Sequence, residues 1–263
     1  MELGLKDKVA IVPASSKGLG RAVAMGLAAE GAKLTICSRN EDDINKTAKE
    51  IIDTTGSQVL ALNADVSDQK ELEYIVNKTT DTFGTIHILI NNAGGPPFGY
   101  FDQFDMEQWQ KAIELNLFST IRLTQLVTPY MIDNMWGRII NITSIAVKQP
   151  LDGLILSNTS RAGVTGFAKT ISNELAKHNI LVNNVCPGRI FTDRIKSLAD
   201  SRAKQEGKSF EQIIEAMQSD IPVGKIGTPE EFANMVVFLA SEKASYITGN
   251  TIQIDGGLLK GIF

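Results

Sequence analysis

The chain has 263 residues, of which 43% are hydrophobic and 21% are charged. This length is enough for one α/β domain with a full hydrophobic core. The formal net charge of −4 at pH 7 gives no reason to expect binding to nucleic acid or to an anionic membrane surface.

Short β-branched runs alternate with longer amphipathic patterns along the whole chain. In chain order they predict a strand at 9–12, a helix at 18–30, a strand at 34–37, a helix at 42–54, a strand at 59–64, a helix at 68–83 and a strand at 86–91. The order continues with a helix at 106–136, a strand at 138–143, a helix at 157–177, a strand at 181–186, a polar helix-prone segment at 192–226, a helix at 229–239 and a strand at 251–254. Continuous apolar strands between amphipathic helices indicate a parallel sheet covered on both faces. The prediction is a single doubly wound, Rossmann-like α/β domain over 1–263, with about seven strands and a lid at 192–226.

The cysteines and histidines of the sequence favour neither a disulfide nor a metal site. Cys37 and Cys186 each lie in an apolar, strand-like run, which favours two buried thiols in a reducing compartment over a disulfide. His87 and His178 are far apart and have no ligand-like neighbours, so no metal site is predicted. Neither the N-terminus nor any apolar run suits a targeting or membrane segment, and we expect a cytoplasmic protein.

A turn with two glycines joins the first strand to the first helix. It reads Ala14-Ser15-Ser16-Lys17-Gly18-Leu19-Gly20. A turn that enters a helix presents unpaired N–H groups to an anion, and these glycines would allow close approach of a pyrophosphate and of the helix. The turn therefore predicts a dinucleotide site. An ordinary strand-to-helix turn is the alternative, since Ala14 replaces an expected first glycine and Pro13 removes a backbone donor.

The end of the second strand indicates which dinucleotide is preferred. An acidic residue there would bond a ribose 2′-hydroxyl and repel a 2′-phosphate. The chain instead has Ser38 and Arg39, and Lys17 adds positive charge in the turn. Because arginine makes charge-assisted bonds to phosphate, we predict NADP(H), with NADPH preferred over NADH. A solvated surface arginine is the alternative interpretation.

Further motifs follow in a characteristic order. They are Asp65-Val66, Asn91-Asn92-Ala93-Gly94, Asn116, Ser144, Cys186-Pro187-Gly188, Thr192 and Asp255-Gly256-Gly257. With these motifs the chain resembles the short-chain dehydrogenase/reductase family, classical type, and especially its 3-oxoacyl-acyl-carrier-protein reductase branch. The resemblance covers essentially the whole chain, and it implies a homotetramer built through the helices at 106–136 and 157–177.

The resemblance also implies roles for individual residues. Asp65 and Val66 would contact the adenine, and Ser144 would bond a substrate carbonyl. Asn116 would hold a water molecule in a proton relay. The remaining cofactor contacts would come from Asn91, Ala93, Gly94, Pro187, Gly188, Ile190 and Thr192.

Two positions depart from the family pattern. The family places a tyrosine thirteen residues after the serine and a lysine four residues later, where this chain has Ser157 and Arg161. Serine is a far weaker acid than tyrosine, and arginine does not exchange protons at ordinary pH. Arg161 would still bond a cofactor ribose, whereas general acid–base catalysis, typically worth about 10²–10⁴-fold, would be weakened. Tyr100, in the loop after the fourth strand, is an alternative proton donor.

Three functions remain open. The first is an NADP(H)-dependent oxidoreductase acting on a carbonyl or alcohol, 3-oxoacyl reductase-like but with an atypical active site. The second is a dinucleotide-binding pseudoenzyme or sensor without turnover, and the third is a structural subunit of a mixed oligomer. Basic residues of the lid would suit an anionic substrate, and they are Arg194, Lys196, Arg202, Lys204 and Lys208. Acidic neighbours in the same segment favour the alternative that these residues form a solvated helical face.

Overall fold

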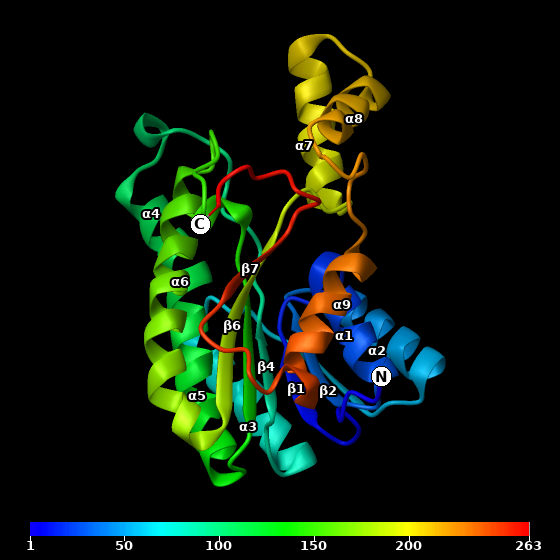
Figure 1. The fold of residues 1–263 in the computed structure, drawn as a ribbon, viewed down its shortest axis with the longest axis vertical. Helices are drawn as coiled ribbons and strands as arrows, with labels where there is room; N and C mark the ends of the chain where they lie inside the picture. Colours follow the sequence, from blue (N-terminus) through cyan, green and yellow to red (C-terminus); the bar gives the residue numbers. More distant parts are fainter. Residues whose placement is uncertain (263) are drawn as a thin grey trace.

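The computed structural model describes residues 1–262, and one parallel sheet forms its centre (Figure 1). The strands are β1 (Val9–Val12), β2 (Lys33–Ser38), β3 (Val59–Asn63), β4 (Ile88–Asn91), β5 (Gly137–Ile142), β6 (Ile180–Pro187) and β7 (Thr251–Ile254). Their order across the sheet is β3-β2-β1-β4-β5-β6-β7, and all neighbours pair in parallel. The predicted Rossmann-like α/β fold is confirmed.

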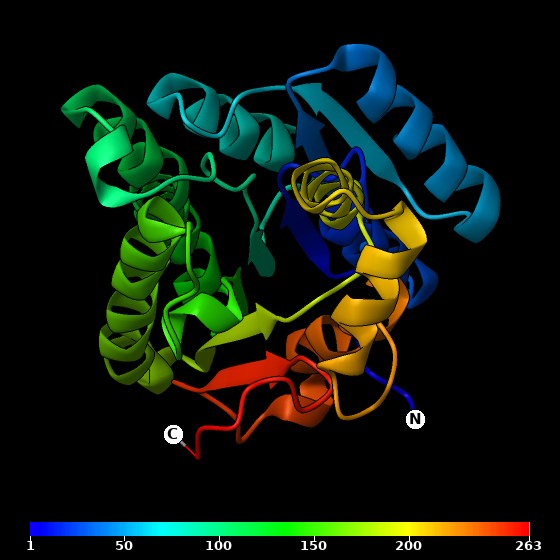
Figure 2. The same cartoon turned by 90° about the horizontal axis from the view of Figure 1, so that it is seen from above.

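Helices cover both faces of the sheet. They are α1 (Gly18–Ala29), α2 (Glu41–Thr55), α3 (Gln69–Phe83), α4 (Met106–Ile113), α5 (Ser119–Asp133), α6 (Ile155–Leu175), α7 (Asp193–Glu206), α8 (Phe210–Ser219) and α9 (Pro229–Ala240). The helices α1, α2 and α9 lie on one face and α3, α5 and α6 on the other, as the two views show (Figures 1 and 2).

The continuous apolar strands are explained by these two layers. Side chains alternate along a strand, so Ala10 and Val12 join the core beneath α1, α2 and α9, while Ile11 joins the core beneath α3, α5 and α6. In β4, Ile88 and Leu89 divide between the two cores in the same way. Because both sides of the central strands are buried, no polar alternation appears in their sequences.

The strand order places the candidate site. The order reverses between β1 and β4, and in open α/β sheets ligands bind at such a switch point, beyond the carboxyl ends of the strands. The loops after β1, β4, β5 and β6 meet at this edge.

The structure differs from the predicted helix at 106–136. This stretch comprises α4, a π-helical turn at Glu114–Phe118 and α5. A π-helical turn adds one residue to the hydrogen-bonded ring and shifts the following side chains around the axis. Asn116 lies at the centre of this turn and is buried.

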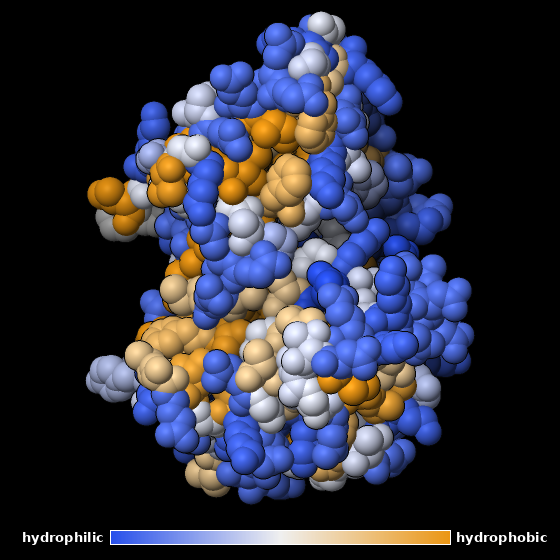
Figure 3. All heavy atoms as spheres, turned by 90° about the vertical axis from the view of Figure 1, so that its right-hand side faces the viewer, coloured by the Kyte–Doolittle hydropathy of each residue, from blue (hydrophilic) through white to orange (hydrophobic). Residues whose placement is uncertain are grey.

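The segment at 192–226 contains α7 and α8, which project beyond the carboxyl edge of the sheet (Figure 1). Its buried residues form a small apolar cluster of their own, including Ala199, Ile213 and Met217. Apolar side chains are also exposed in this upper part of the molecule, among them Leu198 and Val223 (Figure 3). Within residues 1–262, none of the helices is sufficiently long and apolar to span a bilayer.

Candidate functional site

The turn after β1 is strongly curved and held from two sides. Ala14 has φ of 49° and Gly18 has φ of 59°, both in the left-handed region. A Cβ on Gly20 would lie 2.6 Å from the carbonyl oxygen of Ala14, so only glycine fits there. The Asn92 side-chain amide, from the loop after β4, donates to the carbonyl oxygens of Pro13 (3.0 Å) and Ala14 (3.1 Å). Asn92 was not among the predicted site residues, although the Asn-Asn-Ala-Gly motif contains it.

Hydrogen bonds of Ser15 and Ser16 hold this turn to neighbouring elements. The buried Ser15 hydroxyl donates to the Val12 carbonyl at 2.6 Å, and the Ser15 backbone N–H donates to the Cys37 carbonyl at 3.1 Å. The Ser16 carbonyl accepts from the Thr47 hydroxyl at 3.0 Å. Leu19 packs against the core. In this structure Ser15 thus shapes the turn and has both of its donors bonded within the protein.

The N-terminus of α1 is open to an anion. Its N-cap residue, Lys17, makes no side-chain capping bond, and the first turn contains no acidic residue. By contrast, side chains cap α2, α3, α4, α8 and α9. The first N–H groups of α1 and the positive end of its dipole therefore face the turn without a compensating side chain.

Arg39 and Asp65 lie together beyond β2 and β3. The Arg39 side chain is 81% exposed, and its Nη1 atom lies 3.9 Å from Oδ2 of Asp65. The Ser38 hydroxyl donates to the Asn40 carbonyl at 2.8 Å. Asp65 and Val66 line an open groove of about 550 Å³. The predicted adenine and ribose contacts are therefore brought to one edge of the sheet.

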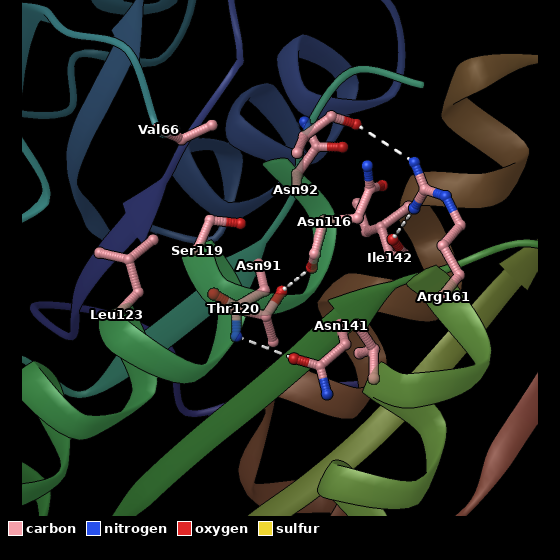
Figure 4. Close-up of a pocket in the computed structure, with 12 residues that line it drawn as sticks. Val66, Asn91, Asn92, Asn116, Ser119, Thr120, Leu123, Asn141, Ile142 and Arg161 are labelled. Atoms are coloured by element: carbon pink, nitrogen blue, oxygen red, sulfur yellow. Dashed lines mark hydrogen bonds between the residues drawn. The ribbon is translucent and has the colours of Figure 1, made fainter. Parts of the chain in front are cut away.

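A small cavity of about 10 Å³ lies between β4, β5 and the helices α5 and α6 (Figure 4). Asn91 donates through Nδ2 to Oδ1 of Asn141 (2.8 Å) and to the Thr124 hydroxyl (3.2 Å). Oδ1 of Asn91 and Oδ1 of Asn116 are both buried without a hydrogen-bond partner. Two unpaired acceptors thus line one cavity, beside Arg161.

Arg161 is buried in α6, one turn after the buried Ser157. Its Nη1 donates to the carbonyls of Ile142 (2.8 Å) and Thr143 (3.2 Å), and its Nη2 lies 3.5 Å from the carbonyls of Ala93 and Gly94. Burial, and to a lesser degree the charge of Arg194, lowers the pKa of Arg161 to about 10. Arg161 is the residue that we predict to bond a cofactor ribose. In this structure its shorter hydrogen bonds go to carbonyls at the carboxyl end of β5.

Ser144 lies two residues after the end of β5 and is the N-cap of a short 3₁₀ turn, Ile145–Val147. Its Oγ accepts a hydrogen bond from the Ala146 N–H at 3.1 Å. Tyr100 lies elsewhere, 53% exposed and edge-on to Phe98, and it does not line the cavity.

The residues after β6 connect the sheet to α7. Gly188 packs so closely on Asp255 that a Cβ there would lie 2.5 Å from the Asp255 Cβ, which brings the two glycine-containing motifs together. Pro187 ends β6. Ile190 is buried in the core. The Thr192 methyl would lie 3.6 Å from a Cβ on Gly18, so Thr192 stands beside the turn that precedes α1.

Arg194 is a site residue that the sequence reasoning did not single out. Its Nη2 lies 3.5 Å from the Pro96 carbonyl, and its guanidinium covers Gly95 so closely that a Cβ there would overlap it. Other basic residues of the segment pair locally: Lys196 with Asp193 (3.6 Å), Arg202 with Glu206 (2.9 Å) and Lys208 with Glu206 (2.7 Å). Arg194 alone of these reaches the loop after β4.

Comparison with known proteins agrees with this arrangement. The family model described as "Enoyl-(Acyl carrier protein) reductase" matches residues 13–259. The 3-oxoacyl-[acyl-carrier-protein] reductase FabG of Aquifex aeolicus is 34% identical over 258 residues, which cover 98% of this chain and 100% of that protein. L-Sorbose reductase from Gluconobacter frateurii, solved with NADPH and L-sorbose, superposes with a TM-score of 0.96 at 33% identity over the full length of both chains. YwfH, an NADPH-dependent reductase involved in bacilysin biosynthesis, gives 0.94 at 34% identity, covering 98% of this chain and 100% of YwfH. The chain belongs to the short-chain dehydrogenase/reductase family.

Proposed function

We propose that this chain is an NADP(H)-dependent oxidoreductase that interconverts a carbonyl and an alcohol, with Ser157 and Arg161 in place of the usual tyrosine and lysine acid–base pair. The observation that carries the proposal is the turn at 13–20, which Asn92 holds against the uncapped N-terminus of α1. A helix end of this kind binds phosphate. The oxidoreductase relatives and the NADPH-containing neighbours support the same assignment.

The residues present fit a dinucleotide. Neither Pro13 nor Ala14 leaves an unmatched carbonyl in the turn, because Asn92 bonds both. Gly18 keeps the backbone free of a Cβ atom where the pyrophosphate would approach, and Gly20 lets α1 pack closely on the turn. The exposed Arg39 and Lys17 supply positive charge for a 2′-phosphate. When bound, the nicotinamide supplies hydride chemistry.

On the substrate side, we assign two roles to residues of this chain. The Ser144 hydroxyl donates to the substrate oxygen while its own oxygen accepts from Ala146. Asn91 and Asn116 hold one water molecule between their unpaired Oδ1 atoms, since a cavity of about 10 Å³ is close to the minimum for one water. This water continues the proton path from the site toward the π-helical turn.

Arg161 acts as a fixed cation in this proposal. Its pKa near 10 keeps it protonated at neutral pH, and its bonds to β5 tie α6 to the site. It therefore positions the loop after β4 and favours negative charge on the substrate oxygen, without transferring a proton. Proton transfer then falls to Ser144 and the water, so we expect weaker acid–base catalysis than a tyrosine would give.

The test begins with fluorescence titrations of NADPH and NADH, followed by NADPH oxidation with 3-oxoacyl thioesters and ketoses. The double variant Ser157→Tyr/Arg161→Lys should raise kcat by about 10-fold or more if only the proton donor is missing. Arg161→Lys alone and Thr159→Tyr, on the exposed side of the same helix, are the controls. Urea unfolding of each variant shows whether the loss of the Arg161 bonds has destabilised the fold.

Tight NADPH binding without turnover of any substrate would contradict this proposal and favour a dinucleotide sensor without turnover. No measurable binding of either nucleotide would refute it outright. If the double variant folds and binds NADPH but gains no activity, the substrate pocket itself has diverged from that of the 3-oxoacyl reductases.

A further inference from the structure

The two cations nearest the loop after β4 lack acidic partners. Arg161 approaches the carbonyls of Ala93 and Gly94, and Arg194 approaches that of Pro96 while covering Gly95. Neither guanidinium lies within 4.0 Å of a carboxylate in residues 1–262, whereas Arg21, Arg122, Arg189 and Arg202 all do. Two like charges thus share a four-residue loop with only carbonyl dipoles to compensate them.

The two arginines differ in how many N–H donors they can offer to a ligand. Arg161 is 8% exposed, and its Nη1 hydrogens are directed to Ile142 and Thr143. Arg194 is exposed, and its one backbone contact is long, at 3.5 Å. Most of its five N–H donors are therefore available for a planar oxyanion.

We propose that Arg194 binds a carboxylate of the substrate, with Arg161 contributing positive potential from beneath the loop, so that the substrate is an oxo acid or the corresponding hydroxy acid. This assignment deepens the proposed function and rests on it for the carbonyl chemistry. A carboxylate at Arg194 relieves the repulsion between the two arginines, and guanidinium and carboxylate match as a bidentate pair. The contact also places the substrate carboxylate between α7 and the loop after β4, where Arg194 approaches Pro96.

The test compares matched substrates and matched variants. Acetoacetate and methyl acetoacetate present the same ketone with and without the carboxylate, and NADPH oxidation gives kcat/KM for each. Wild-type protein should prefer the acid by about 10-fold or more. Arg194→Gln should lower kcat/KM for the acid by about 10–100-fold while changing that for the ester by less than about threefold. Arg202→Gln, which removes the same charge from the same helix, should leave both unchanged.

Three results would overturn the assignment. One is an ester reduced as well as the acid by wild-type protein. Another is an equal effect of Arg194→Gln on both substrates. The third is a rise in the NADPH dissociation constant of Arg194→Gln that matches the loss for the acid, since the anion would then be a cofactor phosphate.

A failure of the proposed function can be told apart from a failure of the anion site. If no ketone is reduced, calorimetric titration of acetoacetate into the protein–NADPH complex still reports on Arg194. Saturable binding that Arg194→Gln weakens by about 10-fold or more supports the site. Absence of binding to the wild-type complex refutes it.

Discussion

The side-chain amide of Asn92 donates to the carbonyl oxygens of both Pro13 and Ala14, at 3.0 and 3.1 Å. The loop after β4 therefore determines the shape of the turn after β1. These two loops lie at the position where the strand order reverses. One side chain thus couples the fold's switch point to the proposed phosphate site.

Replacing Asn92 should weaken nucleotide binding by more than the accompanying loss of folding stability would cause. Asn92→Ala leaves two carbonyls without their donor, and a net loss of about 1–2 kcal/mol in the free energy of unfolding is expected. Because the turn loses its support, the NADPH dissociation constant should rise by about 10-fold. Asn134→Ala is the matched control, since Asn134 bonds the Thr85 hydroxyl (2.6 Å) and the Ile86 carbonyl (3.4 Å) before β4, at the opposite edge of the sheet. Equal nucleotide affinity in the two variants would contradict the role given to Asn92.

Arg39 should determine the preference between the two nucleotides. Its side chain is 81% exposed and pairs only distantly with Asp65, at 3.9 Å. Arg39→Gln removes a charge-assisted contact with the 2′-phosphate, so the NADPH dissociation constant should rise by about 10-fold or more. NADH lacks this phosphate and serves as the internal control, with an expected change below about threefold. The NADPH effect should also shrink at high ionic strength. A parallel loss for both nucleotides would show that Arg39 does not recognise the phosphate.

Much of the fold follows from the apolar pattern, and the reason is visible in β1 and β4. Ala10, Val12 and Ile88 face one helical layer, whereas Ile11 and Leu89 face the other. A strand buried on both sides gives a continuous apolar run, and the amphipathic helices between such strands indicate parallel crossovers. Strand β1 and strand β7 match the predicted ranges, and most other boundaries shift by one or two residues.

The site was less predictable because it depends on contacts between distant segments. A helical pattern does not distinguish an α-helix from one interrupted by a π-helical turn, so the break around Asn116 was missed. The bonds of Arg161 go to carbonyls of two different strand ends, which side-chain identity alone does not reveal. Arg194 looked like one of several basic residues on a solvated helix, and only the fold brings it to Pro96.

Two glycines should respond oppositely to alanine. Gly18 has φ of 59° at the start of α1, where a Cβ is strained, so Gly18→Ala should lower the free energy of unfolding by about 1–2 kcal/mol. Gly166 lies inside α6, and a Cβ added there would meet no atom within 4 Å, so Gly166→Ala should raise the free energy of unfolding by about 0.5–1 kcal/mol. Urea unfolding measures both. Two changes of the same sign would contradict the backbone conformation at residue 18.

His87 should make stability depend on mildly acidic pH. Its Nδ1 accepts the Val9 N–H at 3.0 Å, and its ring meets Trp136 edge-on, with Lys8 over the same indole. Burial, followed by the charge of Lys8, lowers the pKa of His87 from 6.5 to about 4. The unfolded chain therefore binds the proton more readily, and the contribution to stability is full above about pH 6.5 and is lost as the pH falls toward 4. With a discount for the half-exposed ring, the loss amounts to about 1–2 kcal/mol.

The variant His87→Asn separates this titration from that of the carboxylates. Asparagine keeps an acceptor for the Val9 N–H but takes up no proton in this range. Free energies of unfolding should therefore decline less steeply between pH 6.5 and 4 in His87→Asn than in wild-type protein, although the variant starts from a lower value because it loses the ring contact with Trp136. Parallel curves over this interval would mean that the imidazole takes up no additional proton on unfolding, and the acid sensitivity would then belong to other groups.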